Sequence, residues 1–322
     1  MTDPIEIRGD CDARFAAVRE AFGKNFEQGV EVGASFSAVV GGACVVDLWA
    51  GHADAEKTRP WERDTIVNVF STTKMMAALS TLLLVDRGQL DLDAPVASLW
   101  PEFSQQGKDE IPVRQLLSHT SGLPGWDTPI SIETLFDWDQ AVSLLAAQKP
   151  WWKPGTQSGY HAITHGFLLG EVVRRACGDT IGGFFREQIA EPLGADFHIG
   201  TAAEHDARIG ELIPPGAQAG AENSDPGSIA ARAIGNPALT GDVANRLEWR
   251  RAEIPAANGH GNARSVARVA GAVADRGSPL LSEATLAKAI EEQHYATDLV
   301  LGVPIRWGLG FGLTSKEDRK AS

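Results

Sequence analysis

The stretch VNVFSTTKMMAALSTLLLV, residues 67–85, places a serine and a lysine at the start of a run that is otherwise almost wholly apolar. Apolar residues occupy nearly every helical face of this run, which predicts a helix buried on all sides. Gly88 suits the left-handed cap at its end. Ser71 and Lys74 lie three residues apart, so they share one helical face. A lysine is rarely buried, because moving an ammonium out of water is costly, so Lys74 marks either a solvated helix end or a site of chemistry.

The spacing of Ser71 and Lys74 suits acyl transfer. A serine hydroxyl becomes a useful nucleophile only when a base lies within hydrogen-bond reach. Burial above an apolar helix lowers the pKa of Lys74 towards the neutral form that can accept the proton. At a helix N-terminus the backbone N–H of Ser71 can stabilise a developing oxyanion. Both residues are common, so the Ser-x-x-Lys spacing alone is weak evidence.

Length and composition indicate an ordinary globular protein. The 322 residues suit one large domain or two interleaved domains. The chain is 43% hydrophobic and 22% charged, and its net charge of −13 opposes binding to nucleic acid. The N-terminal MTDPIEIRGD lacks an export signal, and the apolar run from Met75 to Val85 is too short to span a bilayer. We therefore expect a cytoplasmic protein that binds neither nucleic acid nor membrane.

Metal and disulfide patterns are weak. The three cysteines are widely spaced and form no pair or cluster, so we expect small buried side chains. His161 and His165 lie one helical turn apart, as in the zinc motif H-E-x-x-H. Ala162 stands where that motif has its glutamate, and no third ligand suggests itself. We expect neither a metal nor a cofactor.

Periodic patterns outline the remaining elements. Apolar residues at three- and four-residue steps predict a helix over 12–28, and two β-branched runs joined by Gly41 and Gly42 predict a hairpin over 35–50. A Gly-, Ala- and Pro-rich stretch, 214–245, predicts a long loop. WGLGFGL, 307–313, predicts a glycine-rich strand. Helical patterns recur over residues 113–117, 132–148, 164–177, 184–189, 266–274 and 282–293.

Further segments follow Ser-x-x-Lys in a specific order: LLSHTSGL (116–123), WWKPGTQSGYH (151–161), EPLGADFHIG (191–200) and NGHGNARSVARVAG (258–271). Together they resemble the serine β-lactamase and penicillin-binding-protein superfamily, with most similarity to family VIII carboxylesterases and class C β-lactamases. The resemblance extends from about Arg14 to Leu313.

The resemblance implies an α/β fold of the β-lactamase and DD-peptidase type. Residues 1–71 and 256–322 would form a discontinuous domain with a mainly antiparallel sheet flanked by helices. Residues 72–255 would form an inserted, mainly helical domain. The active site would lie between the two domains.

The resemblance also implies roles for individual residues. Ser71 would be the acylated nucleophile, Lys74 its proton acceptor, and Tyr160 the phenol that shuttles the proton to the leaving group. The Lys74 cation could lower the pKa of Tyr160 far enough for the phenol to act as a base. Trp126, Trp152 and His161 flank the matched motifs and are expected to line the substrate pocket, with ordinary packing as the alternative.

Two departures from the family pattern bear on activity. Tyr160-His161-Ala162 replaces the Tyr-x-Asn of β-lactamases, which favours ester over lactam chemistry. The third motif, Lys-Thr-Gly or its His- or Trp-containing counterpart, is absent. Its strand would supply the second oxyanion donor, so we expect that donor to be missing from this chain and the sheet to be incomplete at the C-terminus. For this reason we doubt the activity of these 322 residues alone.

The sequence thus favours a carboxylesterase that acts on small, short-chain esters through an acyl-enzyme on Ser71. The first alternative is a β-lactamase or D-alanyl-D-alanine carboxypeptidase. A second is a non-catalytic relative that binds a ligand. The sequence does not define the acyl group, the alcohol or the oligomeric state.

Overall fold

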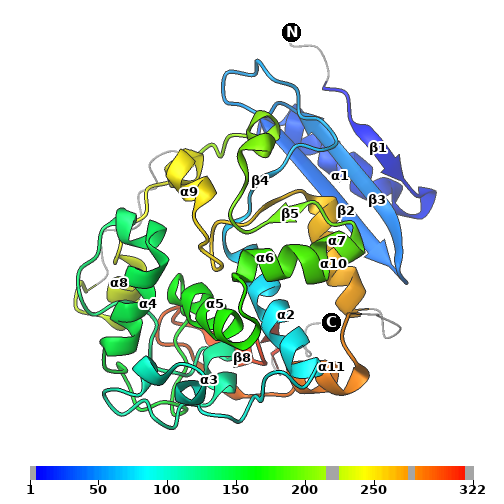
Figure 1. Ribbon diagram of the computed structural model, residues 1–322. Helices are drawn as coiled ribbons and strands as arrows, with labels where there is room; N and C mark the ends of the chain where they lie inside the picture. The colour runs from blue at the N-terminus through cyan, green and yellow to red at the C-terminus, as the bar shows by residue number, and fades with distance from the viewer. Residues whose placement is uncertain (1–4, 215–224, 275–279, 316–322) are drawn as a thin grey trace.

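Three small antiparallel sheets lie among many helices in the computed structural model, which describes residues 5–214, 225–274 and 280–315 (Figure 1). Their strand orders are β1-β3-β2, β4-β6-β5 and β7-β8-β9. The strands are β1 (Arg8–Cys11), β2 (Gly33–Val40), β3 (Ala43–Gly51), β4 (Val67–Asn68), β5 (Phe197–His198), β6 (His260–Gly261), β7 (His294–Thr297), β8 (Pro304–Trp307) and β9 (Gly312–Leu313). The expectation of a sheet built from both chain ends is met only where β4 pairs with β6. Among the described residues, β7, β8 and β9 pair among themselves and form a separate sheet.

The helices agree with most of the predicted helical patterns. They are α1 (Ala16–Glu27), α2 (Thr73–Asp86), α3 (Val113–Leu117), α4 (Trp138–Ala147), α5 (Thr164–Cys177), α6 (Ile181–Phe185), α7 (Glu191–Leu193), α8 (Ile229–Ile234), α9 (Leu247–Arg251), α10 (Ala263–Ala274) and α11 (Glu283–Ala289). The predicted loop over 214–245 is wrong in one part, because 229–234 form α8, capped by the Ser228 side chain. Residues 215–224 of that prediction lie outside the described residues.

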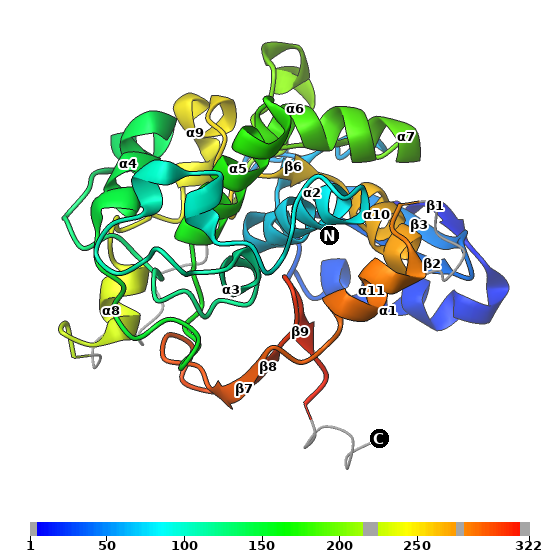
Figure 2. The ribbon, with the colours of Figure 1, turned by 60° about the horizontal axis from the view of Figure 1, so that its bottom comes forward.

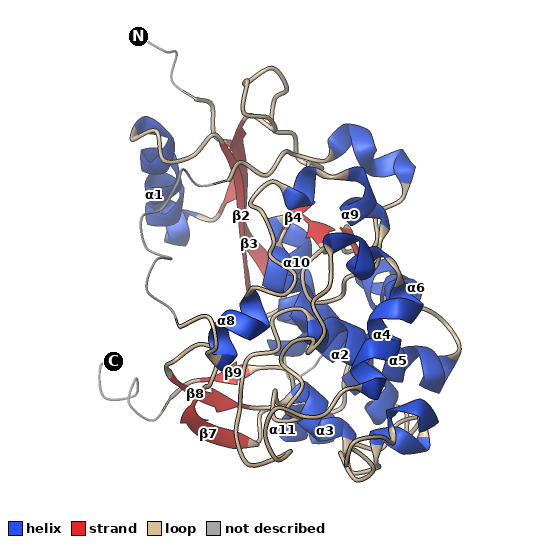
Figure 3. Ribbon diagram, turned by 90° about the vertical axis from the view of Figure 1, so that its left-hand side faces the viewer, coloured by secondary structure: helices blue, strands red, loops and turns tan. Residues whose placement is uncertain are grey.

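The N-terminal sheet confirms the predicted hairpin. β2 and β3 pair from Gly33 with Gly51 to Val40 with Ala43, and Gly41 and Gly42 take the positive φ that their turn requires. Figure 3 shows α1 on one side of this sheet and α10 on the other. Phe22 and Phe26 of α1 pack against the buried side chains of β3. This layer places α10 between the sheet and the rest of the molecule.

Helix α2 lies at the centre of the main core, as its all-round apolarity predicted. Its side chains are buried from Met76 to Leu84. It contacts α5, α6 and α11 (Figure 2). Burial of this helix fixes the position of its N-terminal turn, which carries Ser71.

The WGLGFGL segment is a tight hairpin and not one strand. Trp307 ends β8, and β9 begins at Gly312 after a turn in which Leu309 is buried. Gly310 has φ +82°, and a Cβ there would lie 2.3 Å from the Cβ of Ala78 on α2. Only glycine permits this approach. The hairpin is therefore pressed against α2, and the amide of Gly310 donates to Leu117 O at 3.0 Å.

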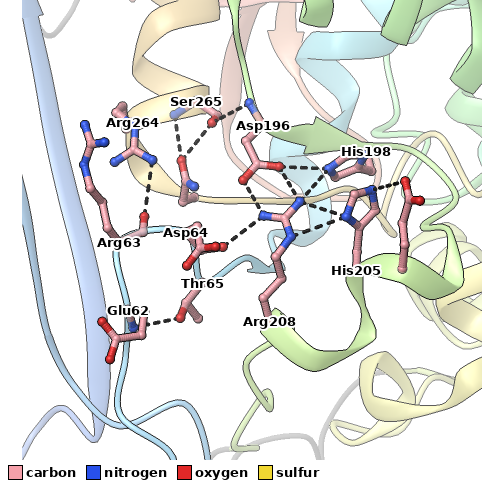
Figure 4. A network of polar contacts seen from close by, with 12 residues as sticks. Glu62, Arg63, Asp64, Thr65, Asp196, His198, His205, Arg208, Arg264 and Ser265 are labelled. Atoms are coloured by element: carbon pink, nitrogen blue, oxygen red, sulfur yellow. Dashed lines mark hydrogen bonds and ion pairs between the residues drawn. The ribbon is translucent and has the colours of Figure 1, made fainter.

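A polar network anchors the loop before β4, the strand that leads to Ser71 (Figure 4). The Arg208 guanidinium donates to both carboxylate oxygens of Asp196 and to Asp64 O, the latter at 2.9 Å. His198 donates to Asp196 at 2.9 Å, and the Asp196 amide donates to Ser265 Oγ at 2.8 Å. These bonds connect β5, α10 and the approach to β4.

Some predictions about organisation have other outcomes. The expectation of buried cysteines is wrong for Cys44, which is exposed beside the hairpin turn, and Cys11 and Cys177 are half-buried. None of the helices in the described ranges has the length and apolarity to cross a bilayer. The division into a discontinuous α/β domain and an inserted helical domain stays a prediction.

Candidate active site

Ser71 lies exposed on a strained turn at the tip of α2. A 3-10 turn, Phe70–Thr72, precedes the helix, and Phe70 has a φ of +40°, which is uncommon for a residue with a side chain. The amide of Val69 donates to Gly259 O, and the amide of Gly259 donates to Thr73 Oγ1, both at 2.9 Å. A Cβ at Gly259 would lie 2.5 Å from Thr73 Oγ1, so this close brace needs glycine. The turn is thus held rigidly against the chain before β6.

The structure brings Ser71, Lys74 and Tyr160 together. Lys74 Nζ lies 3.1 Å from Ser71 Oγ, and Tyr160 Oη donates to Ser71 Oγ at 2.7 Å. Lys74 Nζ also lies 4.7 Å from the centroid of the Tyr160 ring. A nucleophile with a base and a phenol in hydrogen-bond reach is the geometry that acyl transfer requires. The catalytic roles of these residues stay predictions.

Burial prepares Lys74 to act as a base. Its side chain is buried, and Nζ also donates to Ala162 O at 2.6 Å and Ala256 O at 3.0 Å. Burial lowers the pKa of Lys74 from 10.5 to about 7. A neutral amine has two hydrogens for the two carbonyls and a lone pair for the hydroxyl of Ser71. The arrangement therefore suits the neutral amine that the mechanism needs.

The expectation that Lys74 depresses the pKa of Tyr160 is wrong. Burial raises the pKa of Tyr160, the hydrogen bond to Ser71 opposes this, and the charge of Asp298 adds to the increase. The cost of desolvating the phenolate therefore has a larger effect on the pKa of Tyr160 than the nearby amine, whose own pKa is about 7. Tyr160 is a neutral phenol at physiological pH, and Lys74 is the group that titrates there.

Contacts that the sequence analysis missed hold Tyr160 in place. The segment around Tyr160 has no regular secondary structure. The amide of Gly159 donates to His119 O at 3.1 Å, the amide of Tyr160 to Asp298 Oδ1 at 2.9 Å, and the amide of His161 to His119 Nδ1 at 3.1 Å. His119 itself has a φ of +60°. His119 lies within the LLSHTSGL motif, so the sequence could have indicated its importance. Asp298 lies outside every motif, and no nearby residue pattern pointed to it.

The structure does not support His161 as a pocket residue. Its side chain is fully buried, with Nε2 2.8 Å from Ser121 Oγ and Nδ1 2.6 Å from Gly159 O. Burial lowers the pKa of His161 to about 4, so the ring stays neutral. His161 therefore braces the Tyr160 segment from behind. Across the ranges that the structure describes, no group of three or more His, Cys, Asp or Glu side chains is placed to hold a metal.

The two tryptophans expected in the pocket lie in different environments. Trp126 is buried in the main core, where Nε1 donates to Ala141 O at 3.1 Å and the ring packs edge-on against Phe167. Its pocket role is therefore corrected to packing. Trp152 is half-buried beside Gly159, where a Cβ would lie 2.6 Å from its ring. A pocket role for Trp152 stays a prediction.

Replacing Trp126 with alanine is expected to lower the free energy of unfolding by about 3–5 kcal/mol, because a large core side chain is lost. Turnover per correctly folded molecule should stay unchanged. Denaturant unfolding and active-site titration measure the two quantities. A changed KM with an unaltered free energy of unfolding would instead show that Trp126 contacts the substrate.

The backbone amide of Ser71 is the expected donor to the oxyanion. Two amides donate the hydrogen bonds that define the first turn. The Thr72 amide donates to Val69 O at 3.1 Å, and the Thr73 amide donates to carbonyl oxygens within the turn. The amide of Ser71 precedes them, at the exposed helix tip where a donor to an oxyanion is needed. The role of the Ser71 amide as an oxyanion donor stays a prediction.

A serine hydroxyl held by a buried lysine and a tyrosine, at the tip of a buried helix, defines a serine hydrolase type of site. Comparison with known proteins then identifies the family. Residues 21–321 match the Beta-lactamase family, and the chain belongs to it.

Individual relatives cover most of the chain. Esterase/beta-lactamase LipL of Mycobacterium tuberculosis is 34% identical over an alignment that covers 95% of this chain and 74% of LipL. A family VIII carboxylesterase of known crystal structure has 42% sequence identity to this protein. Its structure matches with a TM-score of 0.89 over 97% of this chain and 84% of its own. A penicillin-binding protein homologue from Caulobacter crescentus is also 42% identical, with a TM-score of 0.89 over 95% of this chain and 83% of its own. These matches run along nearly the whole chain, so they do not support the doubt about its activity.

Proposed function

We propose that this protein is a carboxylesterase that hydrolyses small, short-chain esters through an acyl-enzyme on Ser71. The observation that carries the proposal is the position of Ser71 Oγ, 3.1 Å from Lys74 Nζ and 2.7 Å from Tyr160 Oη. The similarity to LipL and to a family VIII carboxylesterase supports ester chemistry.

Acylation begins when neutral Lys74 accepts the proton of Ser71 as Oγ bonds to the ester carbonyl carbon. The amide of Ser71 stabilises the oxyanion that forms. As the carbon–oxygen bond to the alcohol breaks, the neutral phenol of Tyr160 donates its proton to the leaving oxygen. The Lys74 ammonium then returns a proton to Tyr160. Both groups are back in their starting forms, and the alcohol departs.

Deacylation uses the same groups in reverse. A water molecule takes the place of the alcohol and passes its proton through Tyr160 to Lys74 as it attacks the acyl carbon. Oγ leaves and recovers a proton from the Lys74 ammonium. Ser71 Oγ lies 3.1 Å from Lys74 Nζ and 2.7 Å from Tyr160 Oη, so the proton transfer between Ser71 and Lys74 needs no large movement.

The surroundings of Lys74 favour esters over β-lactams. Where β-lactamases have the amide of Tyr-x-Asn, this chain has Ala162, which offers a methyl side chain and uses its carbonyl to accept from Lys74. His161 cannot replace the amide, because its ring is fully buried. A β-lactamase or D-alanyl-D-alanine carboxypeptidase is the second candidate, supported by the family match and the penicillin-binding protein homologue.

Two substrates and one covalent probe test the proposal. We expect kcat/KM for p-nitrophenyl butyrate to exceed that for nitrocefin by at least about 100-fold, since the site lacks the amide donor. A fluorophosphonate should add one adduct by mass, on the peptide that contains Ser71. Preference for nitrocefin would favour the β-lactamase, and neither turnover nor adduct would favour a non-catalytic binder.

A further inference from the structure

The phenol of Tyr160 depends on a loop for its position. The segment that carries it contacts the loop of residues 298–303, which joins β7 to β8, at two points. The amide of Leu299 donates to Ser158 O at 2.9 Å, and the amide of Tyr160 donates to Asp298 Oδ1 at 2.9 Å. The C-terminal hairpin therefore holds the segment that places the phenol on Ser71.

Asp298 is the centre of this contact. Its side chain is fully buried. Oδ1 accepts from the amides of Tyr160, Val300 and Leu301 at 2.9–3.0 Å, and Oδ2 accepts from Trp307 Nε1 at 3.2 Å. All four donors are neutral N–H groups. A carboxylate is costly to bury in such surroundings, but only a carboxylate accepts on both oxygens. An asparagine would turn its NH₂ group towards one set of these donors.

Trp307 extends the contact to the ring of Tyr160. The two rings lie nearly parallel, at 8° with centroids 6.3 Å apart. His119 packs against both, 5.2 Å from Tyr160 and 4.4 Å from Trp307. Asp298 thus fixes the backbone of Tyr160 directly through a hydrogen bond. Through its bond to the indole of Trp307 it also fixes the aromatic ring that lies beside the phenol.

We propose that Asp298 is a positioning residue for catalysis, which holds the phenol of Tyr160 on Ser71 through the Tyr160 amide and the Trp307 indole. The inference rests on the proposed function, in which Tyr160 carries the proton to the leaving alcohol. The competing explanation is a structural one. Asp298 would then serve only to cap the turn between β7 and β8 through the amides of Val300 and Leu301.

The variant Asp298→Asn separates these explanations through kinetics. A displaced phenol should lower kcat for p-nitrophenyl butyrate by about 10–100-fold and leave KM within about twofold, because orientation and not binding is lost. In the double variant Asp298→Asn/Trp307→Phe, the indole N–H that faces the new NH₂ group is gone. We expect kcat to recover by about tenfold relative to Asp298→Asn, with Trp307→Phe alone as the reference.

A spectroscopic measurement tests the same contact without turnover. The chain contains two tyrosines, so tyrosinate absorbance in a Tyr295→Phe background reports Tyr160 alone. Loss of the Asp298 charge alone would lower the pKa of Tyr160, whereas displacement of the phenol also removes the hydrogen bond to Ser71 that lowers this pKa. The positioning role therefore predicts that the pKa of Tyr160 does not fall in Asp298→Asn. This result does not require ester hydrolysis. Failure of the proposed function would appear separately, as a wild-type protein with neither turnover nor a Ser71 adduct.

Asp54→Asn is the matched control for a purely structural carboxylate. Asp54 also caps a loop, accepting from the amides of Thr58 and Arg59, and its contacts do not include the catalytic residues. Both variants should melt at a lower temperature, but only Asp298→Asn should lose kcat per folded molecule. If Asp298→Asn matches Asp54→Asn in kcat per folded molecule and lowers the pKa of Tyr160, as loss of charge alone would, the positioning role is overturned.

Discussion

Replacing Ser71 with alanine is expected to lower kcat for p-nitrophenyl butyrate by about 10⁶-fold, to the background rate, because nucleophile removal disables the whole catalytic group. Ser71 Oγ is the atom on which the amine of Lys74 and the hydroxyl of Tyr160 converge. Without it the amine has no proton to accept and no acyl-enzyme forms. Progress curves and intact mass after fluorophosphonate treatment measure both effects.

The control for Ser71→Ala is Thr72→Val, which removes the neighbouring exposed hydroxyl on the same turn. This variant should keep its adduct and its turnover. The melting temperature of Ser71→Ala should stay near that of the wild type, because the side chain is exposed and small. An adduct that persists in Ser71→Ala would contradict the assignment of the nucleophile.

The helices and the N-terminal hairpin could be predicted because their signals are local. Helix α5 occupies the predicted residues, and Gly178 ends it with a φ of +81°. Gly41 and Gly42 likewise mark the turn between β2 and β3 by their own conformational freedom. In each case one short stretch contains both the periodic pattern and its stop signal.

The sheet arrangement could not be predicted in this way. Strands β4, β5 and β6 have two residues each, too few for an alternating pattern. Their pairing joins Asn68 and His198 to His260, residues far apart in the chain. Tertiary contacts such as the Arg208–Asp196 network (Figure 4) decide such pairings, and local propensity does not.

The site divides along the same line. Ser71, Lys74 and Tyr160 lie in segments with recognisable order and spacing, whereas Asp298 is one aspartate whose four donors come from two separate parts of the chain. The pKa of Tyr160 shows a second limit. The apolar helix predicted the burial that lowers the pKa of Lys74 to about 7, but nothing in the sequence indicated the burial that raises the pKa of Tyr160.

Replacing Lys74 with methionine is expected to reduce kcat by about 10²–10⁴-fold, the range for loss of a general base. Lys74→Arg should not restore activity, because a guanidinium stays protonated and cannot accept the proton of Ser71. Both variants fill most of the buried space, so loss of the base and not of packing is tested. Single-turnover acylation by p-nitrophenyl butyrate measures the effect on the first chemical step.

The pH dependence of the wild type gives an independent test of Lys74. Its pKa of about 7 means that the inactive ammonium prevails below neutrality and the active amine above it. The logarithm of kcat/KM should therefore rise with a slope of one up to about pH 7 and then level off. Lys108 supplies the control, since burial lowers its pKa to about 8 and its ammonium donates to backbone carbonyls that include Gln105 and Ala146. Lys108→Met should lower the melting temperature but leave the rise of kcat/KM up to about pH 7 unchanged. A wild-type kcat/KM that stays level well below pH 7 would exclude Lys74 as the base.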